Sequence, residues 1–371
     1  MEQTLLRVLN SLALFNWLSF TSFVFIGAIA QLYQVKQSPH KTKRHEFVVV
    51  SIAKRSVRNS LMECVDHLIT HFGRCPYILV DEGAELIPAL LLKFQYDRVI
   101  VVPKNYRTDL KAKGRAINYF IQNVVKDEYW YSFVDDDNLV MDDTFLYEIP
   151  YYEAKGYVAT NPILKPREGK STIAYIMDWM RYFDDVTVFR FFIGLLKRPY
   201  IGVHGELLTV KGKILKEVGF DFQSITEDFR FSTELVRKDY LMWQSSTVVS
   251  IKSPNSISDL LKQRGRWFKG LLLDLPQSSL VVQLLVGWRL ALWVLGIFGS
   301  WALCWLWFMF DNDFILLTIP GGAYYLFVYV FGVWKTKRYR YFMLIPALGI
   351  IEATSFLPAL RQKGFVVINK N

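Results

Sequence analysis

The chain has 371 residues, a formal net charge of +10, a hydrophobic content of 52% and an aromatic content of 16%. This apolar content is too high for an ordinary soluble domain, and the excess lies at the two ends of the chain, so we expect an integral membrane protein. Positive charge can indicate nucleic-acid binding, but no zinc-finger, helix-turn-helix or aromatic RNA-binding pattern accompanies it, and no nucleic-acid partner is predicted.

Four apolar stretches predict about four transmembrane segments. Ser11–Tyr33 carries no charge and lacks the basic region and cleavage site of a signal peptide, so it is predicted to be a retained anchor. The other three stretches are Leu280–Phe310, Phe314–Trp334 and Tyr341–Leu360. Prolines in the last stretch leave open whether it crosses the bilayer or re-enters it. Basic loops beside these segments predict, by the positive-inside rule, a multi-pass protein whose central region is cytosolic.

Strand and helix candidates alternate after the first membrane segment. The strands are Phe47–Ala53, Tyr77–Val80, Arg98–Val102 and Trp130–Val134, and the intervening helices include Val57–Phe72 and Ala84–Phe94. This order predicts an α/β domain with a Rossmann-like, mostly parallel sheet. Ligands bind at the carboxyl ends of such strands, so Asp81 is a candidate for contact with a base or ribose, the alternative being a loop residue without a ligand.

Three successive carboxylates, Asp135, Asp136 and Asp137, follow the strand Trp130–Val134. Like charges this close repel one another, whereas hard oxygen ligands at this edge suit Mn²⁺ or Mg²⁺ shared with a substrate diphosphate. We therefore predict a metal-diphosphate site. An acidic turn that caps the next helix is the alternative.

A basic loop, Lys104–Arg107 and Lys111–Arg115, precedes the helix that leads to this acidic strand. Cations in the first turn of a helix are unfavourable unless an anion is bound there, so phosphate binding is predicted, with a solvated basic face as the alternative. Further on, Ile173–Leu196 fits an amphipathic helix against lipid headgroups. The glycines around His204 and Gly205 permit close ligand approach or a tight turn. His204 has no partner at metal-ligand spacing.

Two further stretches carry candidate chemistry. Thr226 fits a helix N-cap, and Glu227 and Asp228 fit acidic residues of the first turn, although one of these carboxylates can also serve as a general base. Asn255–Gly270 fits an amphipathic helix that begins with a capping box. On it, Gln263, Arg266 and Trp267 share one face and can hydrogen-bond a sugar, hold a diphosphate and stack on a pyranose; an interfacial anchor has the same composition.

Taken together, these motifs resemble the family 2 membrane glycosyltransferases that include cellulose, chitin and hyaluronan synthases. The resemblance rests on the Asp-x-Asp, the Thr-Glu-Asp and the Gln-x-x-Arg-Trp, in that order, between membrane segments. Three short stretches, Val203–Glu206, Val218–Asp221 and Lys262–Phe268, look most like the Egghead-type β-1,4-mannosyltransferases.

The resemblance implies a GT-A fold and an inverting transfer from a nucleotide sugar. It implies a nucleoside contact for Asp81, a diphosphate contact for Lys113, substrate contacts for Asp135 and Asp136, the metal ligand Asp137, the general base Asp228 beside Glu227, and donor or acceptor contacts for His204, Gly205, Gln263, Arg266 and Trp267. The implied cofactor is Mn²⁺ or Mg²⁺.

The expected domain organisation is an anchor at 1–34, a cytosolic GT-A domain at 35–254, an interfacial helix at 255–279 and membrane segments with a tail at 280–371. The expected function is transfer of one sugar, mannose from GDP-mannose, to a lipid-linked or other glycan acceptor in contact with membrane lipids. A processive polysaccharide synthase that uses a UDP-sugar is the alternative. A receptor that only binds nucleotide sugars has no need of Asp228, and a transporter does not explain the motifs.

Overall fold

The computed structural model describes residues 2–110, 113–310 and 319–361. One eight-stranded sheet, in the order β3-β2-β1-β4-β7-β6-β8-β5, forms the centre of the molecule. The strands are β1 His45–Val50, β2 Tyr77–Asp81, β3 Val99–Val102, β4 Trp130–Asp135, β5 Leu139–Val140, β6 Tyr157–Arg167, β7 Leu208–Lys211 and β8 Leu241–Lys252. Strands β3, β2, β1 and β4 run parallel, as predicted, and β6 runs parallel to β8. Strand β7 lies antiparallel between β4 and β6.

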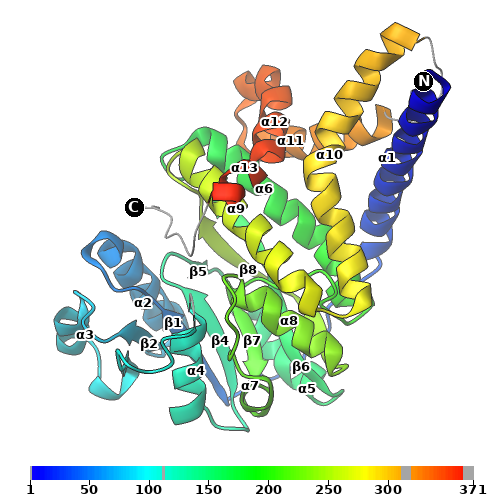
Figure 1. Ribbon diagram of the computed structural model, residues 1–371. Coiled ribbons are helices and arrows are strands. Elements are labelled where there is room, and N and C mark those ends of the chain that lie inside the picture. Colours follow the sequence, from blue (N-terminus) through cyan, green and yellow to red (C-terminus); the bar gives the residue numbers. More distant parts are fainter. Residues whose placement is uncertain (1, 111–112, 311–318, 362–371) are drawn as a thin grey trace.

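Helices cover both faces of this sheet (Figure 1). In chain order they are α2 Arg58–Phe72, α3 Ile87–Lys93, α4 Gly114–Asn123, α5 Thr144–Glu153, α6 Thr172–Asp184, a π-helical continuation η3 Asp185–Leu195, α7 Gly212–Val218, α8 Glu227–Arg237 and α9 Ile257–Asp274. The predicted elements that match them differ by a few residues at their ends. Strands β5, β6 and β8 and helices α5 and α7 are additional to the predicted elements.

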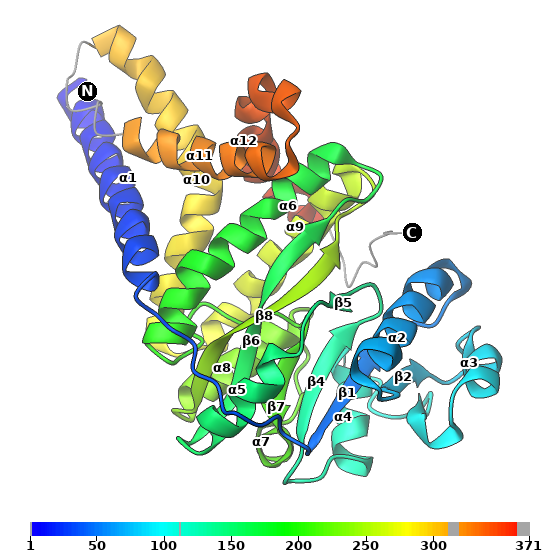
Figure 2. The same cartoon turned by 180° about the vertical axis from the view of Figure 1, so that it is seen from behind.

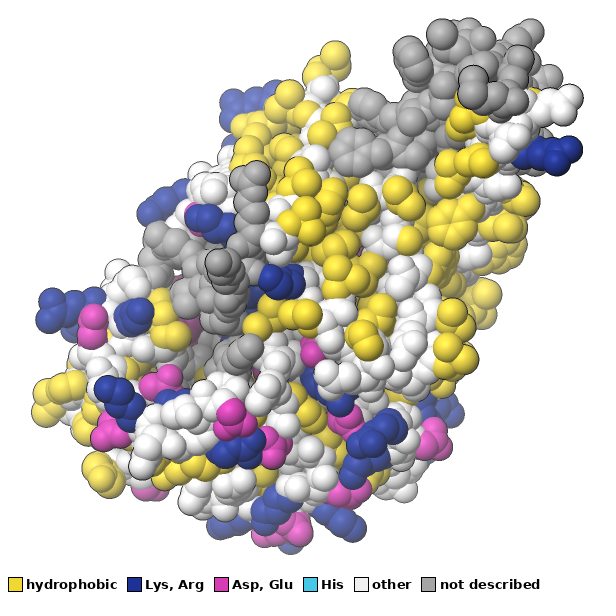
Figure 3. Space-filling model, viewed as in Figure 1, with side chains coloured by type: hydrophobic (Ala, Val, Ile, Leu, Met, Phe, Trp, Pro, Cys, Tyr) yellow, Lys and Arg dark blue, Asp and Glu magenta, His cyan; other side chains and the backbone are white. Residues whose placement is uncertain are grey.

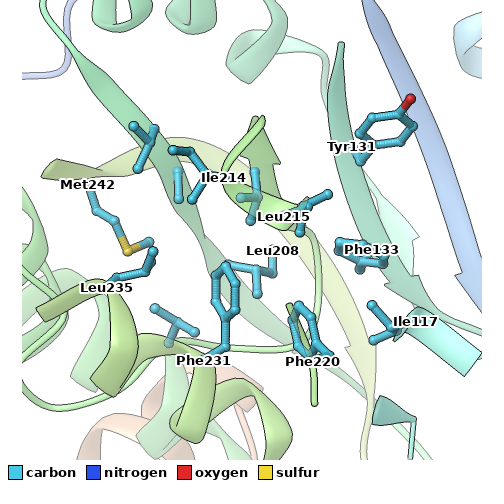
Figure 4. Close-up of a cluster of buried hydrophobic side chains, with 14 of the residues drawn as sticks. Ile117, Tyr131, Phe133, Leu208, Ile214, Leu215, Phe220, Phe231, Leu235 and Met242 are labelled. Carbon is cyan, nitrogen blue, oxygen red and sulfur yellow. The ribbon is translucent and has the colours of Figure 1, made fainter. Parts of the chain in front are cut away.

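Alternation along the central strands builds two hydrophobic cores. In β1, Val48 and Val50 face one side of the sheet, and Phe47 and Val49 face the other, as the period of two requires. The first side packs against α4, α7 and α8, and ten residues of this core are labelled in Figure 4. The second side packs against α2, α3 and α5. With both faces covered, the open carboxyl edge of β1, β2 and β4 is left for ligand binding.

Apolar helices extend from one end of the sheet domain (Figures 1 and 2). They are α1 Glu2–Ala30, α10 Leu280–Phe310, α11 Ile319–Thr336, and the short helices η6 Tyr339–Leu344, α12 Ile345–Thr354 and α13 Phe356–Arg361. Helix α1 begins and ends earlier than the predicted anchor, and it packs against η3, α10 and α11. The start of the predicted segment Phe314–Trp334 and most of the C-terminal tail lie outside the described residues.

Within the described residues, two helical stretches are long and apolar enough to cross a bilayer, Gln3–Ala30 and Tyr339–Leu360, and Leu280–Gly296 is a shorter apolar helix. Exposed large hydrophobic side chains follow α1 and the first half of α10. Figure 3 shows hydrophobic side chains gathered over these helices, whereas charged side chains lie mostly over the sheet domain. Four membrane segments remain a prediction.

The predicted interfacial helix Ile173–Leu196 forms as α6 and η3, but much of it is packed inside the protein. Trp179, Phe189 and Phe192 are buried, and α6 packs between β6 and α11. A Cβ on Gly332 of α11 would overlap the carbonyl oxygen of Ile176, so this glycine permits the close contact of the two helices. The helix therefore joins the sheet domain to the apolar helices.

Candidate active site

A cavity of about 610 Å³ opens at the carboxyl edge of the sheet and extends to the apolar helices. Every residue to which the family resemblance assigns a contact lines it, whereas of the predicted phosphate-binding loop only Lys113 is among the described lining residues. The residues with an assigned contact are Asp81, Lys113, Asp135, Asp136, Asp137, His204, Gly205, Glu227, Asp228, Gln263, Arg266 and Trp267. They come from β2, β4, α8, α9 and the loops between them, so the fold brings the separate motifs together at one site.

Asp81 ends β2, and its side chain is more than half exposed at the mouth of the cavity. Arg115, in the first turn of α4, donates a hydrogen bond to it at 2.6 Å. In the same loop, Arg107 forms ion pairs with Asp109 and Asp221. Carboxylates therefore pair with two cationic side chains of this basic loop, Arg107 and Arg115. Lys111 lies outside the described residues.

The acidic run lies at the end of β4. The Nζ of Lys113 donates to Asp135, and Ser51 Oγ donates to Asp136 at 2.5 Å. Burial, the neighbouring Asp137 and then Asp135 raise the pKa of Asp136 to about 7. Burial lowers the pKa of Lys113, but Asp135 and Glu227 outweigh that effect and raise it overall. The raised pKa of Asp136 thus reflects burial and repulsion among the three carboxylates, and beside them Arg167 donates to the backbone oxygen of Asp137 at 2.7 Å.

This acidic run does not cap the next helix, because α5 begins at Thr144 and has Asp143 at its N-cap. The helix-cap alternative is therefore wrong. In the described part of the chain, no three His, Cys, Asp or Glu side chains are close enough to form a metal site by themselves. Neighbouring carboxylates that line a cavity nevertheless fit a divalent cation that takes its remaining ligands from a diphosphate and water.

The Thr-Glu-Asp motif starts α8. Thr226 occupies the predicted N-cap position, but its hydroxyl donates to Asp274 at 2.9 Å and does not cap the helix. Asp228 Oδ1 accepts from the backbone N–H of Phe229 at 2.8 Å. Burial and then Asp228 raise the pKa of Glu227 to about 7, and burial and then Glu206 raise the pKa of Asp228. Glu227 can thus accept a proton near neutral pH, and the raised pKa makes Asp228 a stronger base than an exposed aspartate.

Gly205 allows the loop before β7 to approach Asp228. A Cβ at this position would lie 3.3 Å from Asp228 Oδ2, a distance shorter than most contacts that Cβ atoms make in proteins. The neighbouring His204 donates from Nε2 to Asp185 at 2.6 Å, and its backbone N–H donates to Asn161 at 2.8 Å. These contacts hold the loop against the π-helical segment.

Helix α9 presents the Gln-x-x-Arg-Trp face to the cavity. Ser256 is the N-cap, as predicted: its Oγ accepts from the backbone N–H of Asp259, and its hydroxyl, not its backbone N–H as in a capping box, donates to the Asp259 carboxylate. The guanidinium groups of Arg264 and Arg181 lie 4.5 and 4.9 Å from the ring centroid of Trp267. Part of the indole is therefore already in contact with cations, which limits the surface available for a sugar.

Sequence reasoning missed the ion pairs on the side of the cavity near the apolar helices. Arg181 donates to Glu206 at 2.7 Å, Arg264 to Asp178 at 2.8 Å and Arg289 to Asp184 at 2.8 Å. The charged residues that interrupt the apolar stretch Ile173–Leu196 are the sequence feature that could have indicated these ion pairs. Arg289 and Glu352, the charged residues of the apolar stretches Leu280–Phe310 and Tyr341–Leu360, do not pair with each other: Arg289 pairs with Asp184, and Glu352 lies beside Arg264.

Apolar side chains continue the cavity toward α1 and α10. They include Phe20, Phe23, Val286, Leu290, Leu292 and Trp293. The cavity thus has an acidic and basic end at the sheet and an apolar end at the helices. This polarity suits a ligand pair in which one partner is a charged diphosphate and the other is amphiphilic.

Comparison with known proteins shows the family of the chain. The family model described as glycosyl transferase family group 2 matches residues 130–345, more than half of the chain. The chain is 26% identical over 307 residues to the beta-1,4-mannosyltransferase bre-3 of Caenorhabditis briggsae, covering 74% of this chain and 67% of that protein. It is 25% identical over 322 residues to the beta-1,4-mannosyltransferase egh of Drosophila melanogaster, covering 78% and 66%.

Among solved structures, the mannosyltransferase PcManGT from Pyrobaculum calidifontis, in complex with GDP-Man and Mn²⁺, has a TM-score of 0.59 and 15% sequence identity. The alignment covers 94% of this chain and 99% of that one. At this identity the likeness concerns the fold, and it supports the predicted GT-A arrangement.

Proposed function

The chain belongs to glycosyl transferase family group 2 and is a nucleotide-sugar glycosyltransferase, and we propose that it transfers one mannose from GDP-mannose to a lipid-linked acceptor with inversion. The single observation that carries this proposal is the cavity that joins Asp81, the acidic run, Asp228 and the Gln-x-x-Arg-Trp face to an apolar wall. The choice of mannose rests on the mannosyltransferase names of its relatives and on the GDP-Man held by the structural neighbour.

In this proposal, Asp81 contacts the nucleoside, and Lys113 and Arg266 contact the diphosphate. Asp137, with Asp136 beside it, holds Mn²⁺ or Mg²⁺. When bound, the cation neutralises charge on the leaving diphosphate. Lys113 is fixed by Asp135 and directed into the cavity, so it can add to this stabilisation without a change of position.

Asp228 serves as the general base. It accepts the proton of the acceptor hydroxyl while that oxygen forms a bond to the anomeric carbon and the bond from this carbon to the diphosphate breaks. Attack opposite the leaving group converts an α-linked donor into a β-glycoside. The raised pKa of Asp228 suits this role, because it makes the carboxylate a stronger base than an exposed aspartate.

The acceptor enters from the apolar side of the cavity. Phe20 and Phe23 of α1 and Leu290 of α10 lie there, and the exposed apolar side chains of both helices suit contact with lipid. We propose a multi-pass protein whose sheet domain is cytosolic and whose acceptor reaches the site laterally from the bilayer. The sugar headgroup of such a lipid would lie at the charged end of the cavity and its hydrocarbon chains at the apolar end.

A donor panel tests the proposal. Detergent-purified protein is incubated with UDP- and GDP-sugars and Mn²⁺, and release of nucleoside diphosphate is followed with and without a glucosyl-lipid acceptor. We expect acceptor-dependent release from GDP-mannose. Release only from a UDP-sugar would contradict the proposal and favour the processive alternative.

Changing Trp267 to alanine is expected to raise the acceptor KM by about tenfold or more and to change donor affinity less, because the indole offers apolar area and not a phosphate contact. Arg266→Lys is the matched variant, since lysine cannot reproduce a bidentate grip on a diphosphate, and it should mainly weaken donor binding. Steady-state kinetics with each substrate varied in turn measure both effects. Equal loss of donor affinity in the two variants would contradict this division of roles.

The pKa of Asp136 predicts a pH dependence of metal binding. Its value of about 7 lies above the value of about 3.9 in an unfolded chain, so between the two the folded protein binds more protons. Ionisation of Asp136 therefore makes the metal-free folded protein less stable as the pH rises toward 7. A divalent cation relieves the repulsion between the ionised carboxylates, so we expect Mn²⁺ to raise Tm more at pH 8 than at pH 6.

Thermal unfolding with and without Mn²⁺ at the two pH values measures this difference. Asp136→Asn is the control, because it removes the titrating group, and the difference should shrink in this variant. Equal Mn²⁺ shifts at both pH values in the wild type would show that Asp136 does not titrate in this range.

A further inference from the structure

Glu352, on α12, is a buried carboxylate that the proposed mechanism does not use. Its residue is 2% exposed, and it lines the cavity near the apolar helices. Among the described residues, neither carboxylate oxygen has a hydrogen-bond partner. The nearest cation is Arg264, whose Nε lies 3.2 Å from Glu352 Oε1 but is not directed at it as a hydrogen bond. A buried carboxylate without donors is unfavourable, which points to a missing partner.

The charges around Glu352 indicate which chemistry that partner has. On this side of the cavity, Arg181, Arg264 and Arg289 donate to Glu206, Asp178 and Asp184. Arg264 is thus shared between Asp178 and Glu352, and these four carboxylates outnumber the three arginines. A ligand group at this position must donate hydrogen bonds and carry no negative charge, as sugar hydroxyls do and a phosphate does not.

The backbone around Glu352 is held in place from two sides. The indole N–H of Trp293 on α10 donates to the carbonyl oxygen of Glu352 at 3.1 Å. On α9, a Cβ at Gly265 would come within 3.1 Å of Ser355 and Ala359, so this glycine lets the C-terminal helices pack directly on the helix that carries Gln263 and Trp267. Glu352 is therefore fixed on the same wall of the cavity as the Gln-x-x-Arg-Trp face.

We propose that Glu352 is an acceptor-binding residue whose carboxylate accepts hydrogen bonds from non-reacting hydroxyl groups of the acceptor headgroup. This inference rests on the proposed function and assigns part of the acceptor subsite to the C-terminal segment. Leu290, Leu292 and Trp293 line the same end of the cavity, so the apolar part of the acceptor continues past Glu352 toward α1 and α10. Arg264 lies between this carboxylate and the ring of Trp267.

The test is the change of Glu352 to glutamine, which keeps the size of the side chain and removes its charge. We expect the KM for a glucosyl-lipid acceptor to rise by about 10- to 100-fold, the usual effect of losing a hydrogen bond to a charged group, with donor KM and kcat nearly unchanged. Glu352→Asp keeps the charge beside Arg264 but withdraws the carboxylate, and should raise the acceptor KM as well. Glu168→Gln is the control, because Glu168 pairs with Arg338 at the surface.

Acceptor analogues that lack single hydroxyl groups complete the test. Removal of one non-reacting hydroxyl should raise the acceptor KM of the wild type and should have no further effect in Glu352→Gln. An unchanged acceptor KM in both Glu352 variants, or an equal rise in donor and acceptor KM, would overturn the inference. Absence of any mannosyl transfer by the wild type would instead overturn the proposed function, so the two failures are distinguishable.

Discussion

Replacement of Asp228 by asparagine is expected to lower kcat by about 10²–10⁴-fold and to leave binding of GDP-mannose and Mn²⁺ intact. An amide cannot accept the proton of the acceptor hydroxyl, although its oxygen can still accept the hydrogen bond from the N–H of Phe229. The change therefore removes the base and preserves the start of α8. Turnover at saturating donor and acceptor, together with donor binding by calorimetry, measures the two effects separately.

A structural role for Asp228 predicts a different pattern. If the carboxylate served only to stabilise the first turn of α8, the variant would lose Tm and keep its turnover. Asp274→Asn supplies the comparison, because Asp274 accepts from Ser224 and Thr226 beside the same turn and is expected to affect Tm.

Replacement of Asp137 by asparagine is expected to lower transfer by about 100-fold or more and to weaken metal-dependent donor binding, because stabilisation of the leaving diphosphate by a cation accounts for several kcal/mol. Asp137 is 6% exposed, so the carboxylate acts inside the cavity and not at the protein surface. Donor affinity measured across a series of Mn²⁺ concentrations tests this assignment.

The control is Asp66→Asn, which removes a partly exposed carboxylate that pairs with Lys93 away from the cavity. It should leave both activity and the metal dependence unchanged. Donor affinity that follows Mn²⁺ in Asp137→Asn as it does in the wild type would mean that another group holds the cation.

The half of the sheet that carries the acidic run could be predicted because its strands are short apolar runs separated by helical patterns. Trp130–Val134 is one such run, and the carboxylates after it fall where parallel strands end. Strands β6 and β8 could not be found in this way, because buried polar residues interrupt their patterns. Asn161 donates to Gln244 at 3.0 Å between these strands, so the amides satisfy each other inside the core.

The parts of the candidate site that could be predicted are those in which the spacing of residues along one element places their side chains together. Gln263, Arg266 and Trp267 lie on one helical face whatever surrounds that helix. Partners from distant parts of the chain were not predictable, and Arg264 shows why. It looks like one more charge on an amphipathic helix, yet it is fully buried between Asp178 and the C-terminal Glu352. Only the packing of α12 and α13 on α9 reveals this.

The structure of the reaction product tests the central claim most directly. Purified protein is supplied with GDP-mannose, Mn²⁺ and a glucosyl-lipid, and the product is examined by mass spectrometry and by NMR of the anomeric carbon. The proposed mechanism predicts one added mannose in β linkage, made by the wild type and made far more slowly by Asp228→Asn. A ladder of many sugars, or a single mannose in α linkage, would contradict it.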